Sequence, residues 1–315
     1  MINKKVCLIG LGNIGMVHLE AYLKLENIDL TVVDINTDVK KIVKKYSLKY
    51  FSHFEDILES NFDIIDICTP TYLHYSQIKF CLKKTKAVIF CEKPFTTSLK
   101  EATELLKISR NKKRLILCAM VERFNDPFIR IKKELKKVNN PYRIFLTRKT
   151  KKPLNDSWYK KEKSGGDIVN DIGIHDIDLS IYLTNEFIVD SSIKKIGGSK
   201  DKVVIDLKLS KGSEASIVLK RDLSEECADG VQNSCKVFYK NKEVISYKSD
   251  DEILMINFVN ENKIKVNKRF PIAYYNEVHA AIGITNGKKN VVFPSNKQLL
   301  NCIQVLNCLN KKYGK

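Results

Sequence analysis

The chain has 315 residues, of which 43% are hydrophobic and 29% charged, a balance typical of globular proteins that excludes general disorder. Lys and Arg outnumber Asp and Glu by 55 to 37, which gives a formal net charge of +18. This surplus suits an anionic ligand. The lysines are nevertheless scattered along helical faces without a nucleic-acid-binding motif, so we interpret most of them as solvated surface and expect no nucleic-acid partner.

Nine cysteines include no CxxC pair, and several lie within apolar, strand-like runs. Their odd number and spacing fit neither a disulfide framework nor a metal site, so we expect small buried side chains in a reducing cytoplasm. No stretch reaches the roughly 18 apolar residues of a membrane span. The sequence therefore predicts a cytoplasmic protein with no metal and no membrane partner.

Residues 1–120 alternate short apolar runs with longer amphipathic segments. The runs predict strands at 6–9, 30–33, 64–68, 87–91 and 115–119, and the segments predict helices near 14–26, 37–46, 71–84 and 98–112. This rhythm is typical of a doubly wound α/β Rossmann domain, with a parallel sheet covered by helices on both faces.

Residues 121–315 have a different character. After Pro127 and a basic helix, strands are predicted near 142–150, 188–197, 202–209, 213–220, 234–239, 243–248 and 253–259, and helices over 167–184, 272–286 and 295–312. Most of these strands are separated only by turns. They predict an α+β domain with an open-faced, mostly antiparallel sheet and helices on one face.

A glycine-rich turn follows the first predicted strand. In "VCLIGLGNIGMVH", Gly10, Gly12 and Gly15 form GxGxxG at the start of a helix. The glycines allow a tight turn, close approach to a pyrophosphate and close packing of helix and strand, while free N–H groups at the helix start receive phosphate oxygens. We assign Asn13 and Ile14 of the same turn to this cofactor site.

The second predicted strand, "LTVVD", ends in Asp34, nineteen residues after Gly15. An acid at this place binds the hydroxyls of the adenosine ribose and repels a 2′-phosphate. Ile35 and Asn36 offer no arginine to hold such a phosphate, so NAD is favoured over NADP. An idle Rossmann scaffold is the alternative.

Polar groups also follow the third, fourth and fifth strands, in "CTPTYLH", "CEKPF" and "MVERFN". The carboxyl ends of the strands form the ligand edge of such a sheet. Lys93 is a lone cation there, between an apolar strand and Pro94, and its ammonium can assist a hydroxyl oxygen that loses its proton. A salt bridge to Glu92 or a surface lysine remains the alternative.

The segment "GGDIVNDIGIHDIDLSIYL" carries a polar stripe along the middle of an apolar helix face. At about 100° per residue, the stripe contains Asp171, His175, Asp178 and Tyr182, and the back of the helix carries Gly173, Asp176, Ser180 and Thr184. Acidic residues are rarely buried without partners. The stripe is either a satisfied internal network or a catalytic group.

Together these motifs resemble the Gfo/Idh/MocA family of oxidoreductases over nearly the whole chain, through "GLGNIGMVH", "CTPTYLH", "CEKPF", "GGDIVNDIGIHDIDL" and "NEVHAAIGITNGKKNVVFPSNKQLL". The resemblance implies that Lys93, Asp171 and His175 form the catalytic group. It places Thr69, Pro70, His74, Glu92 and Lys93 beside the cofactor, and Arg123, Asn125, Trp158, Asp171 and His175 at the substrate. It also implies a homodimer or homotetramer through the C-terminal sheet. Asp167 replaces the usual third glycine of the family's GGG motif.

These assignments give an expected chemistry. The 167–184 helix would pack between the domains with its stripe facing the cleft. His175 would accept the hydroxyl proton, Asp171 would orient it or hold the substrate, and Lys93 would stabilise the developing alkoxide.

The expected function is an NAD-dependent dehydrogenase that oxidises a secondary hydroxyl of a small-molecule sugar. Within the family, the chain most resembles members that oxidise the 3-hydroxyl of UDP-N-acetylglucosamine, and Arg123, Arg148 and Lys149 are candidates to pair with phosphate oxygens. The alternatives are an inositol, free-sugar or sugar-phosphate dehydrogenase, an NAD-dependent glycosidase of the same fold, and a non-catalytic NAD-binding regulator.

Overall fold

The protein divides into two compact units. The computed structural model describes residues 3–57, 61–139, 141–152, 166–224, 230–250, 252–258, 262–266, 270–289 and 292–314. Unit 1 comprises Met1–Phe124 and Phe270–Pro294, and unit 2 comprises Asn125–Arg269 and Ser295–Lys315. The structure thus groups Phe270–Pro294 with the N-terminal part of the chain. The assignment of 1–120 and 121–315 as the two domains stays a prediction.

Unit 1 contains a six-stranded sheet with the order β3-β2-β1-β4-β5-β6, and every neighbouring pair is parallel. The strands are β1 (Lys4–Ile9), β2 (Ile28–Val33), β3 (Lys49–Phe51), β4 (Ile64–Ile67), β5 (Val88–Cys91) and β6 (Ile116–Cys118). The strand order reverses between β1 and β4, and ligands of such sheets bind at the carboxyl ends of the strands at this switch point. The predicted doubly wound fold is confirmed.

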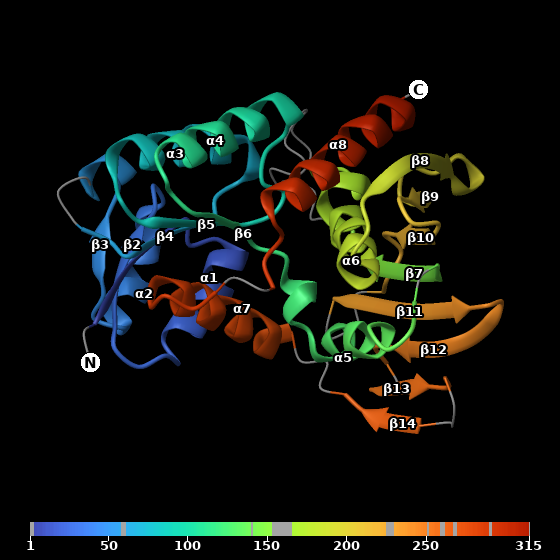
Figure 1. The fold of residues 1–315 in the computed structure, drawn as a ribbon. Coiled ribbons are helices and arrows are strands. Elements are labelled where there is room, and N and C mark those ends of the chain that lie inside the picture. Colours follow the sequence, from blue (N-terminus) through green and yellow to red (C-terminus); the bar gives the residue numbers. More distant parts are fainter. Residues whose placement is uncertain are drawn as a thin grey trace. The chain divides into compact units, whose positions relative to one another are not determined.

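Helices cover both faces of this sheet (Figure 1). Helices α3 (Thr71–Lys84) and α4 (Leu99–Asn111) lie on one face, and α1 (Asn13–Tyr22), α2 (Lys40–Lys45) and α7 (Phe270–Thr285) lie on the other. All four residues of β4 are buried, as expected of a strand enclosed on both sides. Val278 and Ala281 of α7 belong to the same apolar core as Val6 and Leu8 of β1.

Unit 2 contains an eight-stranded sheet with the order β14-β13-β12-β11-β7-β10-β9-β8. The strands are β7 (Arg143–Thr150), β8 (Ile188–Lys195), β9 (Lys202–Leu209), β10 (Glu214–Lys220), β11 (Val231–Tyr239), β12 (Lys242–Lys248), β13 (Ile253–Ile256) and β14 (Asn262–Lys265). The pair of β7 and β10 is parallel, whereas the other pairs are antiparallel. The predicted α+β unit with a mostly antiparallel sheet is confirmed.

The strands of this sheet alternate between a covered and a more exposed face. In β9, Val203, Ile205 and Leu207 are buried, while Asp206 and Lys208 between and beside them are exposed. Helices α6 (Ile174–Thr184) and α8 (Asn296–Tyr313) pack against the sheet, and α5 (Asp126–Leu135) contacts β12 through the rings of Phe128 and Tyr247, 5.7 Å apart. Hydrophobic burial on one face therefore holds this unit together.

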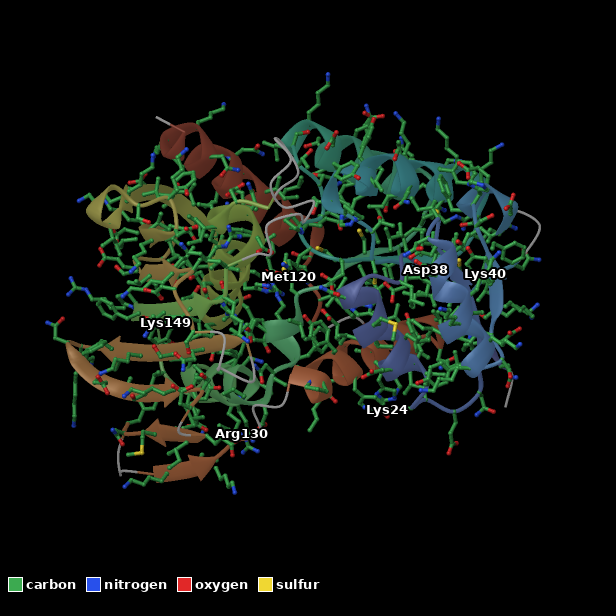
Figure 2. The ribbon with its side chains drawn as sticks, turned by 180° about the vertical axis from the view of Figure 1, so that it is seen from behind. Lys24, Asp38, Lys40, Met120, Arg130 and Lys149 are labelled. Atoms are coloured by element: carbon green, nitrogen blue, oxygen red, sulfur yellow. The ribbon has the colours of Figure 1, made fainter. Side chains whose placement is uncertain are left out.

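Basic side chains project from elements of both units. Lys24 and Lys40 in unit 1 and Arg130 in unit 2 are exposed, and Figure 2 shows them on separate elements. This scatter agrees with the interpretation of most of the positive charge as solvated surface.

Three local features differ from the predictions. The short edge strands β3 and β14 were not predicted. The segment predicted as a helix over 37–46 forms a 3-10 turn at Thr37–Val39 before α2. The predicted 167–184 helix begins with a π-helical turn, Val169–Gly173, and becomes an α-helix only at Ile174.

Candidate active site

The glycine-rich turn joins β1 to α1 at the switch point of unit 1. Gly10 has φ +90°, and a Cβ atom on it would lie 3.0 Å from the backbone of Cys68. A Cβ atom on Gly15 would lie 1.9 Å from the carbonyl oxygen of Gly10, so both positions require glycine. Around Gly12, by contrast, no atom of the described residues lies within 4 Å of such a Cβ. The turn is therefore tight on its inner side and open at Gly12.

The start of α1 offers backbone donors beside that opening. Gly12 is the N-cap, no described side chain caps the helix, and Asn13 and Ile14 form its first residues. The first N–H groups of a helix have no acceptor within the helix and carry the positive end of its dipole. This open turn fits the pyrophosphate of a dinucleotide.

Asp34 follows β2 and is fixed over the glycine-rich turn. Its Oδ2 accepts a hydrogen bond from the Leu11 N–H at 2.6 Å, and its Oδ1 accepts one from the Asn36 N–H at 2.7 Å. The Tyr50 hydroxyl donates to the Asp34 carbonyl at 2.8 Å. The half-buried carboxylate keeps further lone pairs for ribose hydroxyls. Its position fits NAD.

His74 of α3 connects the loops after β4 and β5. Its Nδ1 lies 2.9 Å from the carbonyl oxygen of Pro94, and its Nε2 lies 2.8 Å from that of Thr69. Burial lowers the pKa of this fully buried ring. Pro70 is the N-cap residue of α3, directly after Thr69. His74 therefore supports the loop backbones, and its predicted contact with the cofactor stays a prediction.

Glu92 and Lys93 lie at the end of β5. Glu92 is only 5% exposed, and its Oε2 accepts a hydrogen bond from the backbone N–H of Lys93 at 2.9 Å. Its Oε1 lies 3.2 Å from Nε2 of His18. Lys93 is half-buried. Glu92 thus fixes the backbone from which the predicted catalytic lysine extends.

In unit 2, Asp171 lies in the π-helical turn. Nη2 of Arg221 lies 3.0 Å from Asp171 Oδ2 and also donates to the Gly166 carbonyl at 2.8 Å. The Asp171 side chain is 17% exposed, and His175, at the start of α6, is half-buried. The ion pair with Arg221 holds the Asp171 carboxylate in one position beside the turn.

Asp167, which replaces the family's third glycine, has a local role. Its Oδ1 accepts hydrogen bonds from the N–H groups of Val169 and Asn170, both at 3.0 Å. Its carbonyl accepts from the Asp171 N–H at 2.9 Å. The substitution therefore supplies a carboxylate cap at the start of the π-helical turn.

The remaining polar residues of this helix are buried. Asp178 is 1% exposed, and Asp176 on the back of the helix is also 1% exposed. Asp176 forms a bidentate ion pair with Arg148 at 2.8 and 2.9 Å, in which both side chains are almost completely buried. The prediction that Arg148 is available to a phosphate is wrong, because its guanidinium is committed to this carboxylate.

The other predicted substrate residues have varied surroundings. Arg123 is 2% exposed and donates to the Val292 carbonyl at 3.0 Å, and Asn125, 2% exposed, is the N-cap residue of α5. Trp158 lies outside the described residues. Contacts of these three side chains with a substrate stay predictions.

The structure brings the cofactor residues together within unit 1. The glycine-rich turn, Asp34 and the loops after β4 and β5 lie at the carboxyl edge of one sheet. Asp171 and His175 lie near each other in unit 2. The grouping of Lys93 with these two residues stays a prediction.

Sequence reasoning missed a buried polar cluster in unit 1, which contains His18, Asp66, Glu92 and Glu277. The available signals were single polar residues within apolar segments, as in "IIDIC" for Asp66 and "NEVHAAIGI" for Glu277. Such residues need buried partners, but the sequence does not name them.

The fold and the cofactor site define an NAD-binding oxidoreductase. The chain matches the family descriptions "Oxidoreductase family, NAD-binding Rossmann fold" over residues 4–120 and "Oxidoreductase family, C-terminal alpha/beta domain" over residues 133–251. It belongs to the Gfo/Idh/MocA oxidoreductase family, as its motifs predicted. No helix in the described parts of the chain is long and apolar enough to cross a membrane.

Curated relatives in this family share about a quarter of their residues with the chain. An uncharacterized oxidoreductase, YrbE, of Bacillus subtilis is 27% identical over 73% of this chain and 70% of the relative. The myo-inositol 2-dehydrogenase of Thermotoga maritima is 25% identical over 74% and 72%. The UDP-N-acetylglucosamine 3-dehydrogenase of Acidithiobacillus ferrooxidans is 23% identical over 71% and 69%. The two relatives named as dehydrogenases are named for different substrates, myo-inositol and UDP-N-acetylglucosamine.

Solved structures share the fold. GenD2 from gentamicin A biosynthesis, in complex with NAD, superposes with a TM-score of 0.83 and 14% identity, over 100% of this chain and 95% of that one. The UDP-N-acetylglucosamine 3-dehydrogenase structure from Acidithiobacillus ferrooxidans gives 0.81 and 20%, over 99% and 98%. At this identity the likeness establishes the architecture alone.

Proposed function

We propose that this oxidoreductase uses NAD to oxidise a secondary hydroxyl of a sugar, and that the 3-hydroxyl of a UDP-N-acetylhexosamine or a similar nucleotide sugar is the group oxidised. The observation that carries the dehydrogenase assignment is Lys93 at the end of β5, on the sheet edge that also carries the glycine-rich turn and Asp34. Relatives named as dehydrogenases of sugars and cyclitols support the substrate class.

In the proposed reaction, His175 takes the proton of the substrate hydroxyl as the C–H bond breaks. Imidazole titrates near neutrality and suits this exchange. Bound NAD⁺ accepts the hydride. The products are therefore a ketone, NADH and one proton, which His175 passes to solvent.

The other two residues stabilise this step. The Lys93 ammonium donates a hydrogen bond to the hydroxyl oxygen as negative charge develops there. Asp171, held by Arg221, orients His175 or accepts a hydrogen bond from a second substrate hydroxyl.

The nucleotide-sugar assignment rests on the relative named for UDP-N-acetylglucosamine and on the net charge of +18, which favours a diphosphate. A second candidate is an inositol, free-sugar or sugar-phosphate dehydrogenase. The burial of Arg148 against Asp176 favours its inositol and free-sugar members, because these substrates carry no phosphate. A glucose-6-phosphate 3-dehydrogenase of Bacillus subtilis is 29% identical over 60% of this chain and 56% of the relative, which also supports that candidate.

The test is NAD reduction by the purified protein with UDP-N-acetylglucosamine, UDP-glucose, glucose 6-phosphate and myo-inositol at matched concentrations. The proposal expects the highest kcat/KM with a nucleotide sugar. Highest kcat/KM with an uncharged substrate or with the sugar phosphate establishes the second candidate. Bond cleavage in a glycoside without net NADH production contradicts both and indicates a glycosidase that keeps its NAD.

A further inference from the structure

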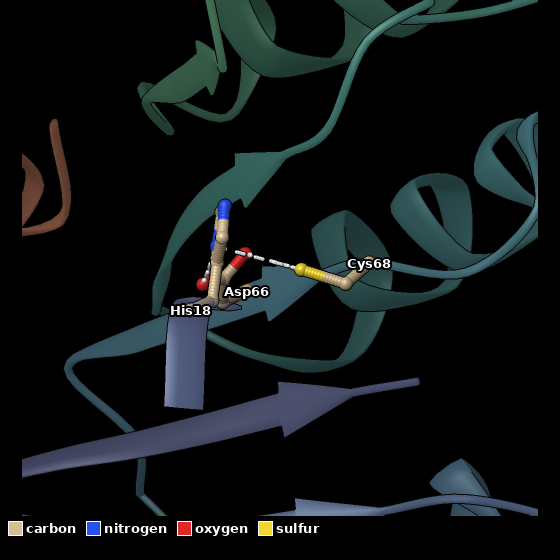
Figure 3. Close-up of side chains that lie close together, drawn as sticks. All are labelled: His18, Asp66 and Cys68. Atoms are coloured by element: carbon tan, nitrogen blue, oxygen red, sulfur yellow. Dashed lines mark hydrogen bonds and ion pairs between the residues drawn. The ribbon is translucent and has the colours of Figure 1, made fainter. Parts of the chain in front are cut away.

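A histidine is buried between two carboxylates in unit 1. Nδ1 of His18 lies 2.8 Å from Asp66 Oδ2, and its Nε2 lies 3.2 Å from Glu92 Oε1. The three side chains are at most 6% exposed. Figure 3 shows the His18 ring beside Asp66, with Cys68 on the other side of the carboxylate. Glu92 is the one residue of this group that was predicted to lie beside the cofactor. His18 and Asp66 were not assigned to the cofactor site.

The hydrogen bonds indicate where the protons lie. The Tyr22 hydroxyl donates to Asp66 Oδ2 at 3.0 Å, and the Lys93 N–H donates to Glu92 Oε2 at 2.9 Å. Each carboxyl group thus accepts a hydrogen bond from a second donor besides the His18 ring. Carboxylate oxygens only accept, so hydrogen bonds at both ring nitrogens require an N–H on each. The position of the ring between two carboxyl groups fits an imidazolium at His18.

The surroundings of His18 shift its pKa in the direction that this arrangement requires. Burial alone lowers the pKa of His18, but its neighbours Cys68 and Asp66 raise it well above its usual value. A charged imidazole in the core is stabilised because a carboxylate lies on each side of the ring.

Glu277 of α7 completes the cluster. Its Oε1 accepts a hydrogen bond from the Met120 N–H at 2.6 Å, and its Oε2 is buried without a hydrogen-bond partner among the described residues. A carboxyl oxygen of Glu277, one of Glu92 and a ring nitrogen of His18 all lie within 4.8 Å of one another. Burial, and the nearby charge of Glu92, raise the pKa of Glu277 well above its usual value. Burial in this cluster therefore favours the protonated form of Glu277.

The cluster connects two parts of the cofactor site. His18 lies on α1, whose N-terminus is the glycine-rich turn, and Glu92 holds the Lys93 N–H. We propose that His18 is a positioning residue: its imidazolium holds Glu92, and Glu92 holds the backbone of Lys93 relative to the helix that receives the pyrophosphate. The functional part of this inference rests on the proposed role of Lys93.

Chemistry explains why both partners are needed. An imidazolium donates in two opposite directions, which a glutamine or asparagine side chain cannot do with the same geometry. A glutamine at position 92 has one acceptor oxygen for two donors, the His18 ring and the Lys93 N–H. Glu92→Gln therefore leaves one donor facing an NH₂ group. Loss of a supporting hydrogen bond of this kind lowers the activity of the site that it supports by roughly 10- to 100-fold.

The first experiment follows the imidazole rings by NMR of the full-length protein labelled at histidine, which has only five such residues. The spectrum of His18→Gln identifies the His18 signals. We expect the His18 ring to be protonated from pH 6 to pH 9 in the unaltered protein and in the control Glu277→Gln. In Glu92→Gln, we expect the ring to lose its proton at a lower pH than it does in the unaltered protein. A neutral ring in the unaltered protein overturns the proposal, as does about one equivalent of zinc or manganese in the purified protein.

The second experiment measures positioning. In Glu92→Gln, we expect faster hydrogen exchange of the Lys93 amide and a fall in kcat of about tenfold or more, with the Kd for NAD within about threefold of that of the unaltered protein. Thermal melting checks that each variant is folded. Unchanged exchange and kcat in a folded Glu92→Gln protein overturn the inference. Full turnover in Lys93→Met refutes the proposed catalytic role of Lys93. It does not refute the positioning of the Lys93 backbone by Glu92, because amide exchange measures that positioning independently of turnover.

Discussion

The two units neutralise buried carboxylates in different ways. In unit 1, Asp66 and Glu92 share one histidine, and every member of the group is almost completely buried. In unit 2, Asp176 pairs with Arg148 and Asp171 pairs with Arg221. Arginine is always charged, so the unit 2 carboxylates do not depend on a histidine for neutralisation.

The difference bears on the roles proposed for two histidines, His18 in unit 1 and His175 in unit 2. His18 holds a proton permanently because two carboxylates need it. His175 is half-buried, and arginines already match the nearby carboxylates Asp171 and Asp176. In its proposed role, His175 exchanges a proton with substrate and solvent while Asp171 and Asp176 keep their arginine partners.

The largest expected effect is a loss of kcat when the residues proposed for proton transfer and alkoxide stabilisation are replaced. His175→Ala and Lys93→Met should each lower kcat by about two to four orders of magnitude, since each removes a positioned acid–base or electrostatic group. NAD binding should be largely retained. The measurement is steady-state NAD reduction together with NAD titration, and His53→Ala at an exposed histidine is the control. Near-normal turnover in either variant contradicts the assigned role.

The next effect tests the arginine-matched carboxylates. Asp176→Ala removes one side of the buried bidentate ion pair with Arg148, so the free energy of unfolding should fall by about 3–5 kcal/mol. Denaturant unfolding measures this change. Asp190→Ala is the control, because its ion pair with Lys208 has side chains that are 63% and 69% exposed, and it should have little effect. Equal effects of the two substitutions would remove the distinction between buried and surface pairs.

A smaller effect concerns cofactor choice in unit 1. The unaltered protein should bind NAD more tightly than NADP, and Asp34→Ala should narrow the ratio of the two Kd values by about 10- to 100-fold through loss of charged hydrogen bonds and of repulsion of a 2′-phosphate. Asp38→Ala, at an exposed acid nearby (Figure 2), is the control. Equal or tighter binding of NADP than of NAD by the unaltered protein contradicts the assigned preference for NAD.

The smallest effect is a change in the pH dependence of stability. Because the folded-state pKa of Glu277 is raised, its contribution to stability is complete below the unfolded value of 4.5 and is lost as pH rises toward the folded-state pKa. Glu277→Gln cannot ionise. Its melting temperature relative to the unaltered protein should therefore increase as pH rises above 5. A constant difference between pH 5 and pH 8 shows that Glu277 does not bind a proton on folding.

The sequence predicted the features that depend on local patterns. The glycine-rich turn, Asp34 and the strand over 202–209 all follow from residues close together in the chain. The strands β3 and β14 were missed because three or four residues form a strand only when a neighbouring strand pairs with them.

The partners of buried charges could not be predicted in the same way. The π-helical turn shifts the hydrogen bonding of the helix without changing its apolar pattern. The pair of Asp176 and Arg148 joins a helix to a strand, and the His18 cluster draws on α1, β4, β5 and α7. These contacts depend on the tertiary packing that brings the elements together.

The division of unit 1 between the beginning of the chain and Phe270–Pro294 also bears on synthesis. Val278, Ala281 and Phe293 belong to the apolar core around β1, so the first 124 residues leave the ribosome well before the side chains that complete their core. During that interval the apolar surface later covered by α7 is not yet covered by it. A shortened protein that stops at residue 124 would preserve this immature state, whereas joining residues 270–294 to it would restore the missing cover.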